Sequence, residues 1–411
     1  MAVSADDLGC RSRFRRGDLS GERTVIFDAI VIGVGGMGSA TAYHLAKRGA
    51  RVLGIEQFNI GHDLGSSHGV TRIIRLAYAE GSSYVPMLRR AYRLWREIQR
   101  VAKEQLLFIT GGIDAGPEEG SIVQGSLQSC RDHRLRYEPL DAQALRRRFP
   151  GYRLPAGIVA IYQPDAGFVL SERAIVAYVA AAQASGAEIH GLEQVRSWKV
   201  ERGRVLVRTN RATYSGRKLI VTAGAWASKV VPYLRRRRLA VPERQVLIWT
   251  QPRKPDRFAL GAFPIFNMEV EERDRLSRYY GFPVFAVPGF KFGKYHHLHE
   301  VTDPETMERE CSPRDEALLR SAIQRYFPDA AGPTLAMKTC LFTNSPDEHF
   351  VIGKHPAHDR VVIAAGFSGH GFKFASVIGE ILADLALEGS AEHFDLTMFD
   401  PMRRVGRLPA G

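Results

Sequence analysis

The sequence of 411 residues predicts an α/β fold in which two domains share the chain, and three observations lead to this prediction. A buried strand, a glycine-rich turn and a helical pattern follow one another after residue 26. Two more buried-strand patterns, at 219–222 and 361–365, appear much later. The stretches 111–170 and 244–339 are less regular, contain many prolines and aromatic residues, and have strand patterns of their own. A parallel-sheet domain interleaved with a second, mixed-sheet (α+β) domain explains these observations.

The first strand, Phe27 to Ile32, leads directly into the sequence Gly-Val-Gly-Gly-Met-Gly and then into a helix. In such a turn Gly33 permits the tight bend, Gly35 lets a pyrophosphate approach the backbone, and Gly38 lets the helix pack closely. The next strand ends at Glu56, whose carboxylate is placed to bind ribose hydroxyls. The pattern predicts a Rossmann-type dinucleotide site, but it does not distinguish NAD from FAD.

The later segments are expected to return to this first domain. A helix is expected from Ser171, short strands follow it, and the apolar run Leu219 to Thr222 passes into small residues at Gly224. The expected organisation is a flexible extension at 1–26, a nucleotide-binding domain of 27–110, 171–243 and 341–396, a substrate domain of 111–170 and 244–340, and a C-terminal tail at 397–411.

The chain is basic, with 57 Lys and Arg against 44 Asp and Glu and a formal net charge of +13. The densest runs, Arg146 to Arg148 and Arg235 to Arg238, follow apolar helical patterns, and cations are favoured at helix C-termini. No recognition helix or aromatic-interleaved motif adjoins them, so no nucleic-acid binding is expected. A basic surface that suits a carboxylate substrate is the other interpretation.

The four cysteines, Cys10, Cys130, Cys311 and Cys340, form no Cys-x-x-Cys pair, which argues against a disulfide framework or a zinc site. The first 26 residues have no apolar core typical of a secretion signal, and no apolar run is long enough to cross a bilayer. A cytoplasmic protein without membrane contact is therefore expected.

Five further segments bear on the choice of cofactor. They are the loop Gly65–Arg75, the strand and turn Leu219–Trp226, the segments Lys338–Thr343 and Asp347–Phe350, and the turn Ala365–Lys373. Taken together and in this order they resemble the sarcosine oxidase family, which includes monomeric sarcosine oxidase, N-methyltryptophan oxidase and pipecolate oxidase. The resemblance covers about residues 27 to 395 and implies a Rossmann-type FAD-binding domain with covalent FAD.

The resemblance implies how the flavin is held. Cys340 matches the cysteine joined through sulfur to the flavin 8α-methyl group, and a thiolate is the nucleophile that this attachment needs; the alternative for a lone cysteine is a small buried hydrophobe. His68, Thr71 and Arg72 match the flavin-contacting loop, where Arg72 would stabilise the reduced, anionic ring. A structural salt bridge is the alternative for Arg72. The other implied cofactor contacts are Gly33, Gly35, Gly38, Glu56, Val195, Gly224, Gly369 and His370.

The substrate side of the site is implied in the same way. Arg75 and Lys373 match the pair that binds the substrate carboxylate, and two fixed cations would orient an amino acid toward the flavin. A solvated surface charge is the alternative for either residue. Phe342 stands where sarcosine-specific members have a tyrosine, which makes the pocket more apolar. An insertion at 269–278 is expected to lengthen a loop beside the pocket.

Lys291 matches the oxygen-activating lysine, whose ammonium would stabilise superoxide, and Tyr280 matches an active-site tyrosine. Family members usually place a histidine four residues after the lysine, but this chain has Tyr295 there, followed by His296. A one-residue insertion lets His296 serve as the catalytic histidine, and the choice between these two residues stays open. The cluster His296, His297 and His299 is expected to end a strand at the surface rather than to bind a metal, so no metal site is expected.

The implied function is FAD-dependent oxidation of the C–N bond of a small secondary amino acid such as sarcosine, with oxygen as acceptor and an imine and hydrogen peroxide as products. The expected partners are the amino acid and O2, and the enzyme is expected to be a monomer. One alternative is a flavin dehydrogenase, or an oxidase of another amino acid such as pipecolate or a proline-like compound. Another is a non-catalytic FAD-binding partner subunit.

Overall fold

The computed structural model describes residues 25–272 and 275–406. The predicted N-terminal extension, 1–26, lies outside the described residues except for its last two, and Ile26 already belongs to the first strand. The predicted tail, 397–411, is described only as far as residue 406, and it begins with a short 3-10 helix, Thr397–Phe399.

The first large sheet is the predicted nucleotide-binding sheet. Its parallel centre runs in the order β9, β2, β1, β12 and β19, with β10 and β11 extending from β12 as an antiparallel hairpin and β18 antiparallel to β19. The strands are β1 (Ile26–Ile32), β2 (Val52–Ile55), β9 (Glu188–His190), β10 (Val195–Glu201), β11 (Arg204–Thr209), β12 (Thr213–Val221), β18 (Val351–His355) and β19 (His358–Ala365). The central strands are buried on both faces, which explains their continuous apolar runs.

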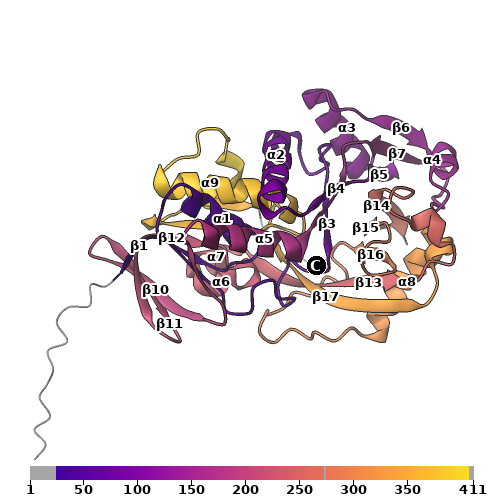
Figure 1. Cartoon of the computed structure of the whole chain (residues 1–411). Coiled ribbons are helices and arrows are strands. Elements are labelled where there is room, and N and C mark those ends of the chain that lie inside the picture. Colours follow the sequence, from indigo (N-terminus) through magenta and orange to yellow (C-terminus); the bar gives the residue numbers. More distant parts are fainter. Residues whose placement is uncertain (1–24, 273–274, 407–411) are drawn as a thin grey trace, which may run out of the picture.

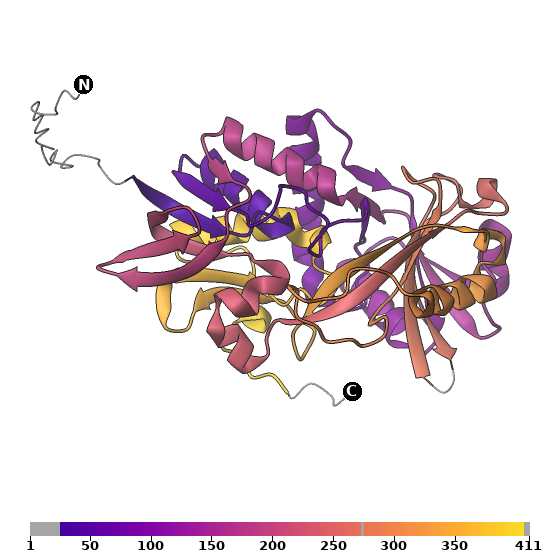
Figure 2. The same ribbon diagram turned by 90° about the horizontal axis from the view of Figure 1, so that it is seen from below.

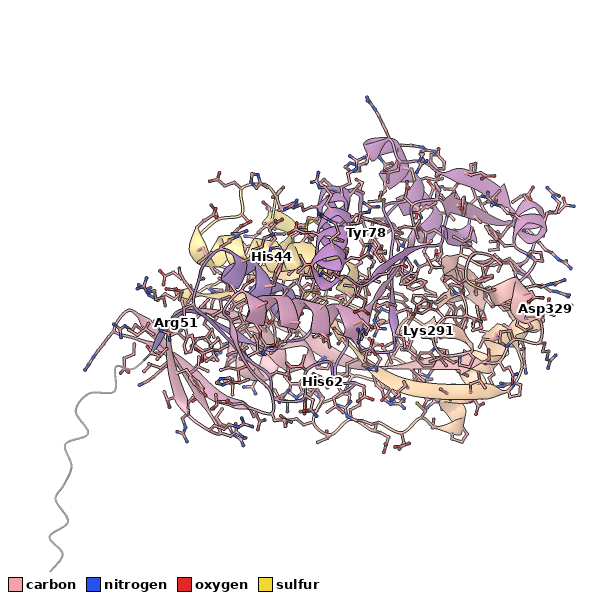
Figure 3. All side chains as sticks on the ribbon, in the orientation of Figure 1. His44, Arg51, His62, Tyr78, Lys291 and Asp329 are labelled. Carbon is pink, nitrogen blue, oxygen red and sulfur yellow. The ribbon has the colours of Figure 1, made fainter. Side chains whose placement is uncertain are left out.

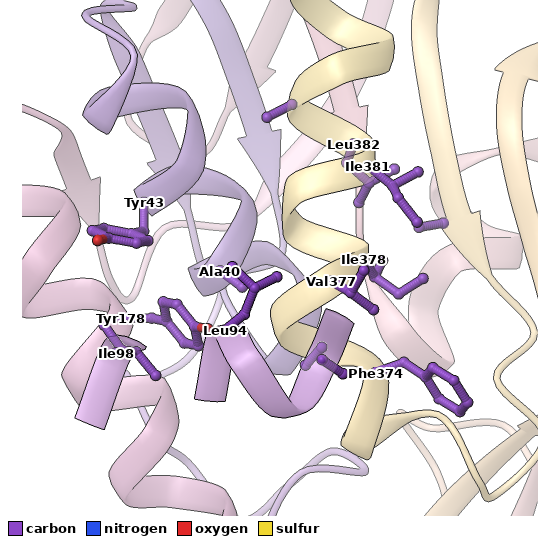
Figure 4. Packing of buried hydrophobic residues seen from close by; sticks show 14 of the residues in the cluster. Ala40, Tyr43, Leu94, Ile98, Tyr178, Phe374, Val377, Ile378, Ile381 and Leu382 are labelled. Carbon is purple, nitrogen blue, oxygen red and sulfur yellow. The ribbon is translucent and has the colours of Figure 1, made fainter. Parts of the chain in front are cut away.

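Helices cover this sheet, and their packing depends on small residues. They are α1 (Gly36–Lys47), α2 (Val85–Ala102), α5 (Ser171–Ala184) and α9 (Ala375–Leu387). Helices α1 and α9 cross so closely that a Cβ on Gly379 would lie 2.6 Å from the backbone of Ala40. Ile378 and Leu94 pack beside them in the same buried cluster (Figure 4). The close approach holds the glycine turn at the start of α1 firmly against the sheet.

The second large sheet has the order β17, β13, β16, β15, β14, β5, β7 and β6, antiparallel except between β14 and β5. Its strands are β5 (Gly112–Pro117), β6 (Glu138–Asp141), β7 (Ile158–Gln163), β13 (Val241–Thr250), β14 (Ile265–Glu272), β15 (Arg275–Phe282), β16 (Phe290–Lys294) and β17 (Thr334–Asn344). The helices α3 (Ser121–His133), α4 (Ala142–Arg148) and α8 (Pro313–Tyr326) belong to this half of the molecule. Figure 2 shows its strands and α8 together, at the right of the view.

A small third sheet joins the two halves. It consists of β3 (Thr71–Ile74), β8 (Gly167–Leu170) and β4 (Leu107–Ile109), and Figure 1 shows β3 and β4 between the two large sheets. Two of the predicted domain boundaries, after residues 243 and 340, fall inside the long strands β13 and β17. These two strands pair along their whole length. The exact division into domains therefore stays a prediction.

Local differences from the sequence-based expectations have simple causes. Within the stretch 244–339 the sequence has a strand-like pattern at 279–287, but β15 ends at Phe282, because Pro283 has no backbone N–H to continue the ladder. The helical pattern at 226–234 is split by Pro232 into α6 (Ala227–Val230) and α7 (Pro232–Arg237). The insertion at 269–278 is not a long loop, because it extends the hairpin of β14 and β15.

The two arginine runs occupy the last turns of α4 and α7, as predicted. Short 3-10 helices complete the fold, at Ser82–Tyr84, Gly224–Trp226, Pro255–Phe258, Pro328–Ala330 and Phe372–Phe374. Within the part of the chain that the structure describes, no helix is both long and apolar enough to cross a bilayer.

Candidate functional site

A cleft of about 210 Å³ runs from the glycine turn of the first sheet to the face of the second sheet. The predicted site residues that line it are Gly33, Gly35, Glu56, Arg72, Arg75, Val195, Gly224, Tyr280, Cys340, Gly369, His370 and Lys373. Five others lie outside the lining: Gly38, His68, Thr71, Lys291 and His296. The fold thus gathers residues from segments more than 300 positions apart along a single cleft.

The glycine turn has the geometry that a dinucleotide requires. Gly33 has a φ of +88°, and a Cβ there would lie 2.7 Å from the carbonyl oxygen of Thr222. A Cβ on Gly38 would lie 1.8 Å from the carbonyl oxygen of Gly33, so no side chain fits between turn and helix. At Gly35 nothing lies within 4 Å of a Cβ, which leaves open space beside the N-terminus of α1. Such a helix end attracts phosphate.

Glu56 is buried at the end of β2 and supports this turn. Its Oε2 accepts a hydrogen bond of 2.9 Å from the N–H of Val34, and its Oε1 accepts one of 3.1 Å from Phe58. Burial raises the pKa of Glu56, whereas these backbone donors oppose the shift. Val195 and Trp226 line the same end of the cleft. An adenosine ribose would meet a carboxylate here.

The loop before β3 is tightly organised. Arg72 donates from Nη2 to the carbonyl oxygen of Ser66 at 2.8 Å and from Nη1 to its neighbour Thr71 at 3.0 Å. Glu172, in the first turn of α5, accepts from the N–H groups of Gly69 and Val70 at 2.6 and 3.0 Å. Both of these loop residues have positive φ, so Glu172 holds a strained turn in place. The sequence interpretation missed Glu172.

Cys340 faces this loop from β17. Its Sγ lies 3.6 Å from Nη2 of Arg72. Burial raises the pKa of the thiol, but the nearby His68 and Arg72 outweigh burial and lower it to about 7. Both ring nitrogens of His68 are buried without a hydrogen-bond partner among the described residues. The site therefore stabilises a thiolate and leaves polar ring atoms beside it unpaired.

Lys291 on β16 is buried and is not one of the residues that line the cleft; Figure 3 labels it in the middle part of the molecule. Its Nζ donates to the carbonyl oxygens of Gly69 and Thr71 at 2.7 and 2.8 Å and to the Thr71 hydroxyl at 3.0 Å. Burial holds the pKa of this ammonium well below its usual range, and Arg72 lowers it further. The lysine thus connects the second sheet to the loop that Arg72 and Cys340 share.

Arg75 is almost completely buried between two carboxylates. Its Nη2 lies 3.0 Å from Oε2 of Glu80, and its Nε lies 3.5 Å from Oδ1 of Asp114 on β5. Arg278 on β15 pairs with the other oxygen of Glu80 at 2.5 Å. Burial raises the pKa of Glu80, but the two guanidinium groups outweigh it and hold that pKa well below its usual range. Asp114 also accepts from Ser126 at 2.8 Å.

Lys373 completes this group of charges. Its Nζ donates to the carbonyl oxygen of His370 at 2.6 Å and lies 3.4 Å from the hydroxyl of Tyr78. Burial lowers its pKa to about 7 and that of His370 to about 4. Among Arg75, Arg278, Lys373, Glu80 and Asp114, three cations face two carboxylates, so one positive charge remains when Lys373 is protonated. The arrangement suits one additional carboxylate.

Aromatic rings form the rest of the wall. Tyr280 and Phe342 line the cleft together with Tyr295, whose ring lies 5.3 Å from Phe342 and 5.5 Å from Tyr280. The guanidinium of Arg278 stacks on the other side of Tyr295, 4.3 Å from the ring centre. Of the two candidates for the position after the lysine, Tyr295 is therefore the one at the cleft. His296 lies behind it, paired with Glu243 and Glu348.

Glu243, His296 and His299 have ligand atoms within 4.8 Å of one another. The sequence interpretation did not predict this cluster, because Glu243 comes from β13, more than 50 residues away. Glu80, Asp114, Tyr78 and Arg278 were also missed. Nothing in the sequence around Glu80, Tyr78 or Arg278 marks them as site residues. Asp114 could have been noticed, because it is a charged residue within a buried strand.

Comparison with known proteins agrees with this geometry. The family described as FAD dependent oxidoreductase matches residues 28–385. The chain is 42% identical to monomeric sarcosine oxidase of Streptomyces avermitilis over 395 residues, covering 93% of this chain and 99% of that protein. It is 34% identical to N-methyl-L-tryptophan oxidase of Citrobacter koseri, covering 91% of this chain and 98% of that protein.

Solved structures share the fold. NikD, described as an unusual amino acid oxidase essential for nikkomycin biosynthesis, superposes with a TM-score of 0.78 at 24% identity, covering 93% of this chain and 99% of the other. The L-proline dehydrogenase of P. horikoshii has a TM-score of 0.79 at 21% identity, covering 92% and 98%. With the cleft, the glycine turn and these relationships established, the chain belongs to the family of FAD-dependent oxidoreductases, in the group of monomeric sarcosine oxidase and N-methyl-L-tryptophan oxidase.

Proposed function

We propose that this FAD-dependent enzyme oxidises the C–N bond of a small secondary amino acid, such as sarcosine, with oxygen as the acceptor. The products are an imine, which hydrolyses to an aldehyde and an amine, and hydrogen peroxide. The observation that carries the proposal is the residual positive charge around Arg75 and Lys373, enclosed by aromatic rings at the end of the cleft opposite to Glu56. The relatives named for oxidation of N-methyl amino acids support the same substrate class.

The residues present fit FAD. Gly35 leaves room for the pyrophosphate, Glu56 would meet the adenosine ribose, and the unpaired nitrogens of His68 would offer polar contacts beside Cys340. Gly224, Gly369 and His370 would complete the contacts along the cleft. When bound, FAD supplies a two-electron acceptor that takes a hydride equivalent and returns electrons to oxygen.

Cys340 is the residue that we propose to bind FAD covalently, as an 8α-S-cysteinyl derivative. A pKa of about 7 keeps a large fraction of the thiol ionised at neutral pH, and the thiolate is the reactive form. Attachment would join Sγ to the 8α-carbon, and the thiol and the methyl group together would lose two protons and two electrons to oxygen. Arg72, 3.6 Å from the sulfur, would stabilise the negative charge of the thiolate.

Lys373 and Arg75 would bind the substrate carboxylate. Arg75 already has two carboxylate neighbours, so the additional anion is balanced mainly by protonated Lys373. Binding fixes the α-carbon and the amine against the walls of Tyr280 and Phe342. The apolar ring of Phe342 favours the neutral amine, the form whose C–H bond can transfer a hydride equivalent.

Arg72 and Lys291 place two cations beside the redox end of the cleft. A buried ammonium stabilises negative charge that develops on oxygen during its reduction, and the low local polarity strengthens the effect. This charge supports oxygen as the acceptor. We also propose that the enzyme acts as a monomer, like the relatives whose names include that word.

A peroxide assay on the purified holoenzyme tests the function. The panel contains sarcosine, N-methyl-L-tryptophan, other N-methyl amino acids, pipecolate and proline, with primary amino acids as controls. Peroxide formed fastest with a small N-methyl amino acid supports the proposal. Substrate-dependent flavin bleaching without peroxide, followed by very slow recovery in air, identifies a dehydrogenase instead. No bleaching by any of these compounds contradicts the substrate class.

A further inference from the structure

His296 joins the two halves of the molecule through two carboxylates. Its Nδ1 lies 2.8 Å from Oε2 of Glu243 on β13, and its Nε2 lies 3.1 Å from Oε1 of Glu348. Glu348 belongs to the loop between β17 and β18, so one partner comes from the second sheet and the other from a loop that leads back to the first. The side chain of His296 is 28% exposed, and its ring meets the edge of Phe342.

The backbone of Glu348 continues this connection toward the substrate pocket. Its carbonyl oxygen accepts a hydrogen bond of 3.0 Å from Nε2 of His370. Because burial keeps His370 neutral, its Nδ1 accepts the hydroxyl proton of Tyr78, at 2.6 Å. The carbonyl oxygen of His370 in turn accepts a hydrogen bond of 2.6 Å from Nζ of Lys373. Glu348 has a φ of +57°, which an L-residue adopts only when its surroundings hold it there.

We propose that His296 is a positioning residue: as an imidazolium between Glu243 and Glu348 it fixes the loop at 345–350, and through His370 it sets Lys373 for binding the substrate carboxylate. The inference rests on the proposed function, because it assigns Lys373 to that carboxylate. Both ring nitrogens must carry protons for this role, since a neutral imidazole has a single N–H and can donate to only one carboxylate. Loss of the proton removes one of these two hydrogen bonds. Glu243 also accepts from the side-chain amides of Gln245 and Asn344, whereas His296 is the one hydrogen-bond donor to the Glu348 carboxylate among the described residues.

The charges that face His296 determine when it is protonated. Glu243 faces it from β13 and Glu348 from the 345–350 loop, while His299 stacks on it from its own loop with ring centres 5.6 Å apart. Tyr295 lies next to it at the end of β16. Burial lowers the pKa of His296, but its hydrogen bonds to Glu243 and Glu348 outweigh burial and raise it to about 9. The bridge is therefore complete below pH 9 and is lost as pH rises through about 9.

The test measures how acetate binds to the holoenzyme, through the change in flavin absorbance. Acetate has a carboxylate and no amine, so the ligand itself does not titrate between pH 7 and 10. At pH 7.5 we expect His296→Gln to weaken acetate binding about tenfold, which corresponds to about 1.4 kcal/mol. His296→Arg keeps a cation with donors for both carboxylates, so it should restore the affinity. His299→Gln, on the exposed neighbour, is the matched control and should bind acetate like the parent enzyme.

The pH profile distinguishes positioning from a general loss of structure. The parent enzyme and His296→Arg should both lose affinity near pH 7 as Lys373 deprotonates. Only the parent should show a second loss near pH 9, because a guanidinium stays charged there. Parent and His296→Gln profiles that differ by less than twofold at every pH would overturn the inference. The second loss of acetate affinity, near pH 9, is measured on the parent enzyme and therefore does not depend on how well a variant folds. If the parent enzyme shows no second loss, the inference is contradicted.

Two controls distinguish the proton bridge from a metal site and the role of His296 from the proposed function. Zinc added to the parent enzyme tests whether Glu243, His296 and His299 bind a metal ion. If zinc tightens acetate binding and EDTA reverses the effect, these residues form a metal site and the proton bridge is contradicted. If the parent enzyme does not bind acetate and has no activity on N-methyl amino acids, the proposed function fails. If the parent binds acetate and His296→Gln binds it equally well, only the role of His296 fails.

Discussion

The side chain of Lys291 on β16 donates hydrogen bonds to both the carbonyl oxygen and the hydroxyl of Thr71 on β3, at 2.8 and 3.0 Å. One buried ammonium thereby connects the second large sheet to the loop that Arg72 and Cys340 share. All of its hydrogen-bond partners are neutral oxygens, so its charge is not cancelled by a direct ion pair among the described residues. When Lys291 is protonated, its charge has no anionic partner in the described part of the chain, which supports the proposal that it promotes oxygen reduction.

Replacing this charge should separate the two halves of the catalytic cycle. We expect Lys291→Met to slow reoxidation of the reduced enzyme by air by at least about 100-fold, the usual effect of losing one preorganised electrostatic group. Anaerobic reduction by substrate should change far less. Stopped-flow absorbance measures both rates, and Lys294→Met, in the same strand, is the control. Equal slowing of both half-reactions would contradict the assignment.

Substitution of Cys340 tests the covalent bond. We expect Cys340→Ser to release its flavin into the supernatant after acid precipitation, whereas the parent and Cys311→Ser keep a yellow pellet. Because the thiol pKa is lowered to about 7, attachment of FAD to the apoprotein should accelerate as pH rises from 6 to 8 and then level off. Flavin absorbance of the washed pellet measures the rate. A colourless pellet from the parent enzyme would remove the covalent assignment.

Lys373 should control affinity for the carboxylate more than the chemical step. We expect Lys373→Met to raise KM by about 30-fold or more, because removal of one buried charge partner commonly costs more than about 2 kcal/mol. Burial lowers the pKa of the free enzyme's Lys373 to about 7, so binding of a carboxylate without an amine should weaken as pH rises through about 7. The Met variant should show no such dependence. Steady-state kinetics and acetate titration provide the two measurements.

The glycine turn allows packing and cofactor binding to be tested separately. Gly38→Ala would place a Cβ 1.8 Å from the backbone of Gly33, so we expect poor folding and a thermal midpoint lowered by several degrees. Gly35→Ala meets nothing within 4 Å in the protein itself, so it should fold normally but lose most of its FAD. Thermal unfolding of the apoproteins and the flavin content after reconstitution distinguish these outcomes. A Gly35→Ala protein with full flavin content would place the pyrophosphate elsewhere.

The choice between Tyr295 and His296 shows where sequence reasoning stopped. From the sequence motif alone, either Tyr295 or His296 could occupy the position that follows the lysine in the family, because an insertion of one residue shifts the alignment by one. In the structure β16 continues its ladder to Tyr295, whose N–H bonds to the carbonyl oxygen of Arg278. Side chains two and four residues apart lie on the same face of a strand, so Tyr295 shares the face of Lys291 and His296 does not. Strict alternation along β16 was a usable signal.

The sequence by itself determined the features that depend on neighbouring residues: the strand, the glycine turn and the helix of the nucleotide site, and the cysteine, arginine and lysine motifs that place the chain in its family. These are local patterns, and a short peptide segment contains all the information needed to recognise them. Only the tertiary structure decided which charges compensate one another around the pocket. Arg75 and Glu80 are only five residues apart, but Asp114 on β5 and Arg278 on β15 come from distant segments, and the tertiary fold brings Asp114 within 4 Å of Arg75 and Arg278 within 4 Å of Glu80.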